Sequence, residues 1–118
     1  MFNKQYSFEP NLVILAGKID LNASAAVLST TDVQNAASVT KTGTGEYTIT
    51  LNDSYTKKLS IQATVESDTD ADLVAQIDSS DIQGNSAAKT IVIKTMAAAV
   101  PTDASAAATI YITILASL

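Results

Sequence analysis

Residues 42–51, with the sequence TGTGEYTITL, decide the fold that we expect for this chain. The two glycines of this stretch mark a tight turn, and apolar and polar residues then alternate. Tyr47, Ile49 and Leu51 would lie on one face of a strand, with Thr48 on the opposite face, because side chains alternate across a strand. The stretch predicts one arm of a β-hairpin whose strand is buried on a single face.

The same period of two recurs elsewhere in the chain, and turn residues separate the runs. Residues 59–66 alternate most cleanly, residues 90–95 repeat the pattern, and residues 109–115 close the chain with isoleucine at every second position. The longest helix candidate, residues 103–108, is short and lies close to Pro101. These observations predict about seven or eight short strands and no long helix.

The expected fold is all-β, a single-domain β-sandwich of jelly-roll or immunoglobulin-like type that spans residues 1–118 with an N-terminal arm of about ten residues. Hydrophobic residues make up 47% of the chain, but 19 of its residues are alanine, so the core should be thin, as between two sheets. The side chains predicted to be buried between the sheets are Ile49, Leu51, Leu59, Ile61, Val65, Ile91, Ile93, Ile110, Ile112 and Ile114.

Composition argues against two classes of partner. The net charge is −5 and the seven cationic residues are scattered lysines, whereas a nucleic-acid interface needs clustered cations. The longest apolar run, residues 12–16, is far shorter than the roughly 20 residues that span a bilayer. The polar start MFNKQYSFEP also lacks the pattern of a secretory signal. We therefore expect no nucleic-acid partner, no membrane partner and no export by the general route.

The catalytic motifs in the chain are better explained as turn and strand residues. Residues 54–57 match S-x-x-K and residues 41–43 match K-T-G, two elements of serine β-lactamases. Their order is reversed, the S-D-N element is missing, and the chain has no histidine to serve as a base. The sequence therefore predicts a protein that is not an enzyme, without catalytic or cofactor-binding residues and without a cofactor.

Asp68, Asp70 and Asp72 have the D-x-D-x-D spacing with which many calcium loops begin. The pattern then departs from an EF-hand, because Leu73 replaces the turn glycine and Ser79 stands where the bidentate glutamate belongs. We interpret these residues as a solvated acidic loop and predict no metal site there.

Two segments together resemble small virion structural proteins of tailed bacteriophages. Residues 38–65, SVTKTGTGEYTITLNDSYTKKLSIQATV, are similar to a pattern of threonine-rich strand, T-G-x-G turn, aromatic-x-hydrophobic strand, acidic turn and further strand. Residues 89–117 resemble the ending of the same proteins, in which a T-D-A loop precedes a last amphipathic strand. The likeness is one of pattern and layout over more than half of the chain.

This resemblance implies a capsid decoration, or cement, protein. Such proteins are small and β-rich, sit on the assembled head, often as trimers, and brace neighbouring subunits of the major capsid protein. It implies a homo-oligomer, with a trimer favoured, that is made in the host cytoplasm and located on the capsid surface of the virion. The alternatives are a head- or tail-fibre domain, or an adhesion module, that binds host surface glycans.

Three segments are the candidates for contacts under this hypothesis. The alanine-rich residues 22–37 and 96–108 carry small side chains that allow close approach and lose little rotamer entropy on ordering. The last strand, residues 109–115, is uncharged and β-prone, so a free edge there would invite strand addition. We expect this strand to be covered by a central place in its own sheet or by a neighbouring subunit.

Overall fold

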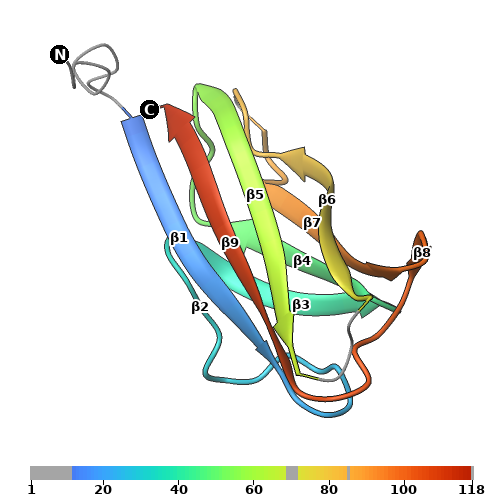
Figure 1. The fold of residues 1–118 in the computed structure, drawn as a ribbon. Helices are drawn as coiled ribbons and strands as arrows, with labels where there is room; N and C mark the ends of the chain where they lie inside the picture. Colours follow the sequence, from blue (N-terminus) through green and yellow to red (C-terminus); the bar gives the residue numbers. More distant parts are fainter. Residues whose placement is uncertain (1–11, 69–71, 85, 118) are drawn as a thin grey trace, which may run out of the picture.

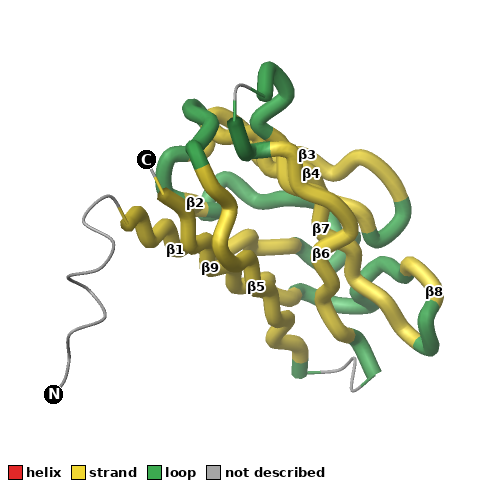
Figure 2. Tube along the Cα trace, turned by 90° about the horizontal axis from the view of Figure 1, so that it is seen from above, coloured by secondary structure: helices red, strands yellow, loops and turns green. Residues whose placement is uncertain are grey.

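The computed structural model describes residues 12–68, 72–84 and 86–117. Two antiparallel sheets pack face to face, and no helix occurs within these ranges (Figures 1 and 2). The predicted all-β sandwich is thereby confirmed. The predicted N-terminal arm lies outside the described residues.

The two sheets contain four and five strands. In spatial order, the strands of sheet A are β2 (Asp32–Val33), β1 (Leu12–Leu21), β9 (Ala108–Ser117) and β5 (Lys57–Ser67). Those of sheet B are β3 (Ala36–Gly43), β4 (Glu46–Leu51), β7 (Thr90–Ala97) and β6 (Val74–Asp81), with the short β8 (Val100–Pro101) paired to β7. The described strands exceed the predicted seven or eight because β2 and β8 have only two residues each.

The strand order shows how the chain runs between the two sheets. The chain changes sheet after β2, β4, β5 and β8, so its strands repeatedly alternate between the layers. The first and last strands, β1 and β9, pair with each other along ten positions of one sheet. An immunoglobulin constant domain places its first and last strands in different sheets, so the strand order here differs from that of such a domain.

The core lies between the sheets, and it confirms most of the predicted buried set. Seven of these ten side chains are at most 2% exposed, namely Ile49, Leu51, Ile91, Ile93, Ile110, Ile112 and Ile114. Ile61 and Val65 pack against this core but are only partly buried, because they lie on β5, the edge strand of sheet A. Tyr47 and Ile82 are also fully buried, although they were not in the predicted set.

The prediction for Leu59 was wrong, since this side chain is 47% exposed. The register between β5 and β9 shifts between Lys58 and Ser60, so Leu59 is the extra residue of a β-bulge. A bulge interrupts the alternation of faces, and residues beyond it regain the expected orientation. The sequence period alone does not reveal where such an extra residue falls.

The last strand occupies the centre of sheet A, between β1 and β5 (Figure 1). Both of its edges are therefore paired within the chain, which is the first of the two alternatives considered for residues 109–115. The helix candidate at residues 103–108 forms no helix, since residues 103–107 are an irregular connection and Ala108 begins β9. No helix in the described parts of the chain could cross a membrane.

Candidate interaction surface

The residues of the two catalytic motifs do not form a catalytic arrangement. Residues 41–43 end β3, whereas Ser54 lies in the connection before β5 and Lys57 begins that strand. In the serine β-lactamase motif, by contrast, the serine and lysine stand one helical turn apart. The Lys41 ammonium group forms an ion pair with the Asp103 carboxylate, at 2.9 Å. The structure thus brings neither motif into the geometry that its chemistry requires.

The structure describes only part of the acidic loop. Asp68 and Asp72 are exposed, and Asp70 lies outside the described residues. Within the described parts of the chain, no group of three or more acidic, histidine or cysteine side chains is placed to hold a metal ion. The absence of an ion site at this loop stays a prediction.

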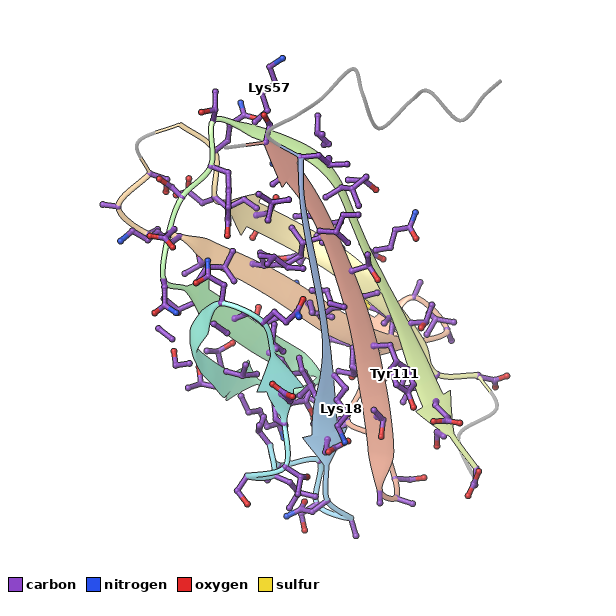
Figure 3. All side chains as sticks on the ribbon, turned by 90° about the vertical axis from the view of Figure 1, so that its left-hand side faces the viewer. Lys18, Lys57 and Tyr111 are labelled. Atoms are coloured by element: carbon purple, nitrogen blue, oxygen red, sulfur yellow. The ribbon has the colours of Figure 1, made fainter. Side chains whose placement is uncertain are left out.

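An exposed tyrosine lies beside an acidic depression on the outer face of sheet A. Tyr111 is 45% exposed and its hydroxyl donates to Glu66 Oε1 at 2.7 Å; this hydrogen bond raises the pKa of the tyrosine (Figure 3). Asp20, which lines the depression with Glu66, accepts a hydrogen bond from Thr30 and pairs with Lys18 at 3.0 Å.

Exposed apolar side chains also lie on the hairpin of β7 and β8 and on the neighbouring strand β6. Val74 of β6 is 57% exposed, and it pairs with Met96, which in turn pairs with Pro101. Val100 is 58% exposed on the same hairpin. We call this region the tip surface; its residues are Val74, Met96, Ala98, Ala99, Val100 and Pro101. None of them is charged. By the register of the strands, Val74, Met96 and Pro101 lie on one face of the sheet, and Val100, which pairs with Ala97, lies on the opposite face.

The turn of this hairpin has an unusual backbone. Ala98 and Ala99 join β7 to β8, and their φ angles are +51° and +64°. Positive φ at both central residues is the signature of a type I′ turn, which normally takes asparagine or glycine. The left-handed conformation costs an alanine about 1–2 kcal/mol. Strained positions that persist in a fold are often functional, so the turn marks the tip surface as a candidate site.

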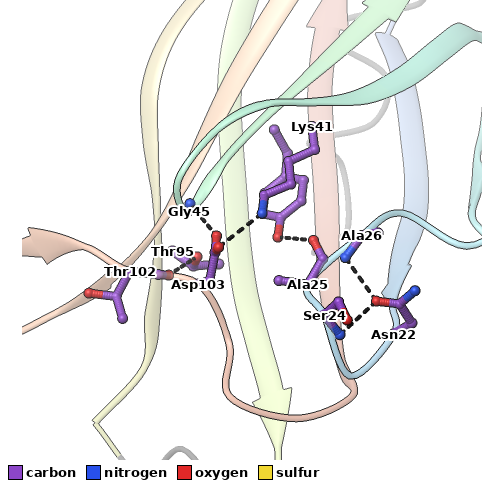
Figure 4. Close-up of polar contacts among 10 residues, drawn as sticks. Asn22, Ser24, Ala25, Ala26, Lys41, Gly45, Thr95, Thr102 and Asp103 are labelled. Atoms are coloured by element: carbon purple, nitrogen blue, oxygen red, sulfur yellow. Dashed lines mark hydrogen bonds and ion pairs between the residues drawn. The ribbon is translucent and has the colours of Figure 1, made fainter.

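A hydrogen-bond network fastens the base of this hairpin to the turn between β3 and β4 (Figure 4). The Gly45 amide donates to Asp103 Oδ1 at 2.7 Å, while Lys41 binds the other carboxylate oxygen. The Thr95 hydroxyl donates to the Thr102 carbonyl at 2.6 Å, and the Thr102 amide returns a bond to the Thr95 carbonyl. These contacts hold the chain where it leaves β8, so the base of the hairpin is fastened at Thr102 and Asp103.

The protonation of Asp103 should control the strength of this network. Burial raises the pKa of this carboxyl, but the hydrogen bonds from Gly45 and Lys41 outweigh burial and bring the pKa below its ordinary value of 3.8. A carboxyl whose pKa is lower in the folded state stabilises the fold above its unfolded pKa. That contribution disappears as the pH falls through the folded pKa.

Asp103→Asn is therefore expected to reduce the free energy of unfolding by about 1 kcal/mol at pH 7, because it removes a charged hydrogen-bond acceptor from a partly exposed site. The difference between the variant and the original protein should shrink as the pH falls below about 4. Urea unfolding of both proteins between pH 7 and a pH below about 4 measures this difference in the free energy of unfolding. Asp32→Asn removes the same charge from an exposed site on β2 and is the matched control. A difference that stays constant with pH would contradict this role of Asp103.

The two alanine-rich segments are only partly available for contacts. Ala25 is fully buried with a φ of +61°, and its carbonyl accepts a 2.7 Å hydrogen bond from the Tyr47 hydroxyl. Burial of this phenol, with the charge of Asp103 adding to it, raises the pKa of Tyr47 to about 12. Ala104 and Ala108 are buried as well. Several of the alanines proposed for contacts thus complete the core of their own chain, whereas Ala23, Ala37, Ala98, Ala99 and Ala107 are exposed.

Comparison of the chain with protein-family models, with curated proteins and with solved structures gave no match. The resemblance to bacteriophage virion proteins therefore rests on the sequence pattern of residues 38–65 and 89–117.

Proposed function

We propose that this protein is a non-enzymatic structural component of a tailed-bacteriophage virion, a decoration or cement protein that binds the assembled head and braces neighbouring major capsid subunits. The tip surface is the part that contacts the shell. The protein acts as a homo-oligomer, with a trimer favoured, and its location is the capsid surface.

The tip surface is the observation that carries this proposal. It combines exposed valines, uncharged neighbours and a strained turn on a base that is held by hydrogen bonds. Small side chains lose little conformational entropy when they are packed, and a base that is already ordered lowers the cost of binding further. A docking surface of this kind would bind through shape and apolar contact, which suits attachment to a pre-assembled shell.

The test mixes the purified protein with undecorated heads of the parent phage and examines the heads by electron cryo-microscopy. We expect added ordered density on the shell, and the symmetry of that density reports the oligomer. Density confined to the tail or fibres, or no binding by the folded protein, would overturn the proposal.

A double variant, Val74→Ser with Val100→Ser, tests whether the tip surface is the contact. Complete burial of a valine contributes about 1.5–3 kcal/mol, and both side chains are already partly covered, so binding to heads should weaken more than tenfold. Leu59→Ser, which removes an apolar side chain that is 47% exposed on sheet A, is the control and should bind normally. Equal losses in the two variants would place the contact elsewhere.

A glycan-binding fibre or adhesion module is the second candidate, and one observation favours it. The exposed Tyr111 beside Glu66 and the acidic depression offers an aromatic face with hydrogen-bonding carboxylates next to it. Binding to host-surface glycans that is lost in Tyr111→Ala, together with no binding to heads, would support this function over decoration.

A further inference from the structure

The outer edge of sheet A is formed by β5, and most of this edge is open. β6 passes beside it, but β6 belongs to sheet B and is bonded to β7 (Figure 1). The chain closes the edge where β5 begins, because a bridge joins Tyr55 to Gln83 and the Lys58 amide donates to Gln83 Oε1 at 2.9 Å. Between residues 60 and 66 no described strand pairs with this edge, and an open edge readily accepts another strand.

The bulge in β5 determines which backbone groups point to this edge. Lys58 points outward, as the hydrogen bond of its amide shows, and the extra residue Leu59 shifts the alternation by one position. Beyond the bulge, Ile61, Ala63 and Val65 therefore direct their amides and carbonyls outward. The side chains of these three residues lie on the core face and are only half-buried, so an added strand would cover them further.

The charges of β5 are placed so that the strand complements itself in reverse. Lys57 and Lys58 stand at its start, and residues 59–65 are uncharged. Glu66 lies near its end, and Asp68 follows directly. All four charged side chains are exposed. An antiparallel copy of the same strand would bring each basic end against an acidic end.

We propose that β5 pairs with β5 of a second copy, antiparallel and around a twofold axis at Ala63. Ala63 bonds to the partner's Ala63, and Ile61 bonds to the partner's Val65. Once the bulge is passed, Lys57 lies opposite the partner's Asp68. The pairing joins two copies and uses no residue of the tip surface, so it is distinct from the trimer favoured for the shell. It goes beyond the function proposed above and does not depend on it.

The outward-pointing residues and the bulge fix this register. A shift by one residue would set outward-pointing groups against inward-pointing ones and core-face side chains against outer-face ones. A shift by two in one direction would set Val65 against Lys58, whose amide is already bonded to Gln83. A shift by two in the other direction would carry Lys57 past the partner's Asp68.

A second copy suits this edge better than an unrelated strand, because unlike charges meet at both ends of the pairing. The net charge of −5 opposes association, so we expect a weak dimer with a dissociation constant of about 10–100 μM. Since the contact is isologous and the start of β5 is closed by residues 82–84, the pairing uses up the open edge of both copies and ends at two.

Analytical ultracentrifugation of the full chain tests the pairing. The protein should convert reversibly from monomer to dimer as its concentration rises to about 1 mM. Lys57→Glu should raise the dissociation constant about tenfold, because it makes both Lys57–Asp68 pairs of the dimer repulsive, and Asp68→Lys should do the same. These two variants change the net charge in opposite directions, so a loss in both cannot come from net charge. A protein that stays monomeric at about 1 mM would overturn the proposal.

The double variant Lys57→Glu with Asp68→Lys is the decisive comparison. It restores unlike charges across the twofold axis, so its dissociation constant should return to within about threefold of the original value. At about 3.3 Å per residue, the two positions lie about 30 Å apart within one chain, so the recovery cannot come from a contact inside the monomer. A double variant that dimerises no better than the single ones would contradict the pairing.

Disulfide trapping tests the register. Gln62 and the partner's Thr64 would form a non-hydrogen-bonded pair on the exposed outer face, where Cβ atoms lie close. The chain has no cysteine, so Gln62→Cys and Thr64→Cys each introduce one thiol. Under mild oxidation, a mixture of the two variants should form the cross-linked heterodimer several times faster than either variant alone forms a homodimer. Equal rates in the mixture and in the separate variants would exclude the pairing around Ala63.

Discussion

Replacing Ile93 with alanine should lower the free energy of unfolding by about 2–5 kcal/mol. Ile93 is fully buried at the middle of β7, where it pairs with Tyr47 of β4 on one side and with Ile77 of β6 on the other. Shortening it removes apolar contacts and leaves a cavity that two sheets of paired strands cannot easily close. Urea unfolding, monitored by circular dichroism, measures the change.

The matched control is Val92→Ala, the neighbouring position on β7, whose side chain lies on the outer face and is half-buried. This change should cost much less than Ile93→Ala. Because a domain of this size is stable by only about 5–15 kcal/mol, the Ile93 variant should also melt at a visibly lower temperature. Similar costs at positions 92 and 93 would contradict a core that lies on one face of β7.

Gly45→Ala should destabilise the protein by about 2–4 kcal/mol, from the left-handed conformation together with steric overlap. Gly45 has a φ of +61°, and a Cβ atom there would lie 2.7 Å from the Thr102 amide nitrogen and carbonyl oxygen and from the Thr95 carbonyl oxygen. All three are backbone atoms in the network at the base of the tip surface, so no side chain can rotate away. The Gly45 amide would also lose its alignment with Asp103.

Gly84→Ala is the control that separates conformation from contact. Gly84 has a φ of +70°, but a Cβ atom there would meet nothing within 4 Å. Its replacement should cost only the left-handed conformation, about 1 kcal/mol. If the two alanine variants unfold at the same denaturant concentration, the close packing around Gly45 does not contribute to stability. The backbone at the base of the hairpin would then be able to move away from an added Cβ atom, despite its hydrogen bonds.

The elements of this fold were largely predictable from the sequence, because they depend on local periodicity. Residues 42–51 form the expected turn and strand, and the isoleucines of the last strand all face the core. The order of the strands was not predictable in this way, since pairings such as β1 with β9 join residues about a hundred positions apart. The bulge at Leu59 depends on its partner strand, so it too is invisible in the period of its own segment.

The candidate site was predictable only in part. The uncharged run of residues 96–101 was visible as a contact candidate, but Val74 joins it through pairing with Met96, over twenty residues away in the sequence. The neighbourhood of Tyr111 and Glu66 likewise arises from the pairing of β9 with β5. A surface that combines several strands can be predicted only when the order of the strands is known. The sequence alone shows only the separate segments.

The pairing of the first and last strands determines how this protein responds to mechanical force. Leu12 and Ser117 are opposite each other at one end of the β1–β9 ladder (Figure 1). Tension applied between these two positions pulls the strands apart from that end, so the load falls on one hydrogen-bonded pair at a time. The hydrogen-bonded pairs of the β1–β9 ladder would therefore break one after another, at low force. Tension applied between Leu12 and Ala108 would instead shear β1 along β9 and load all ten positions together.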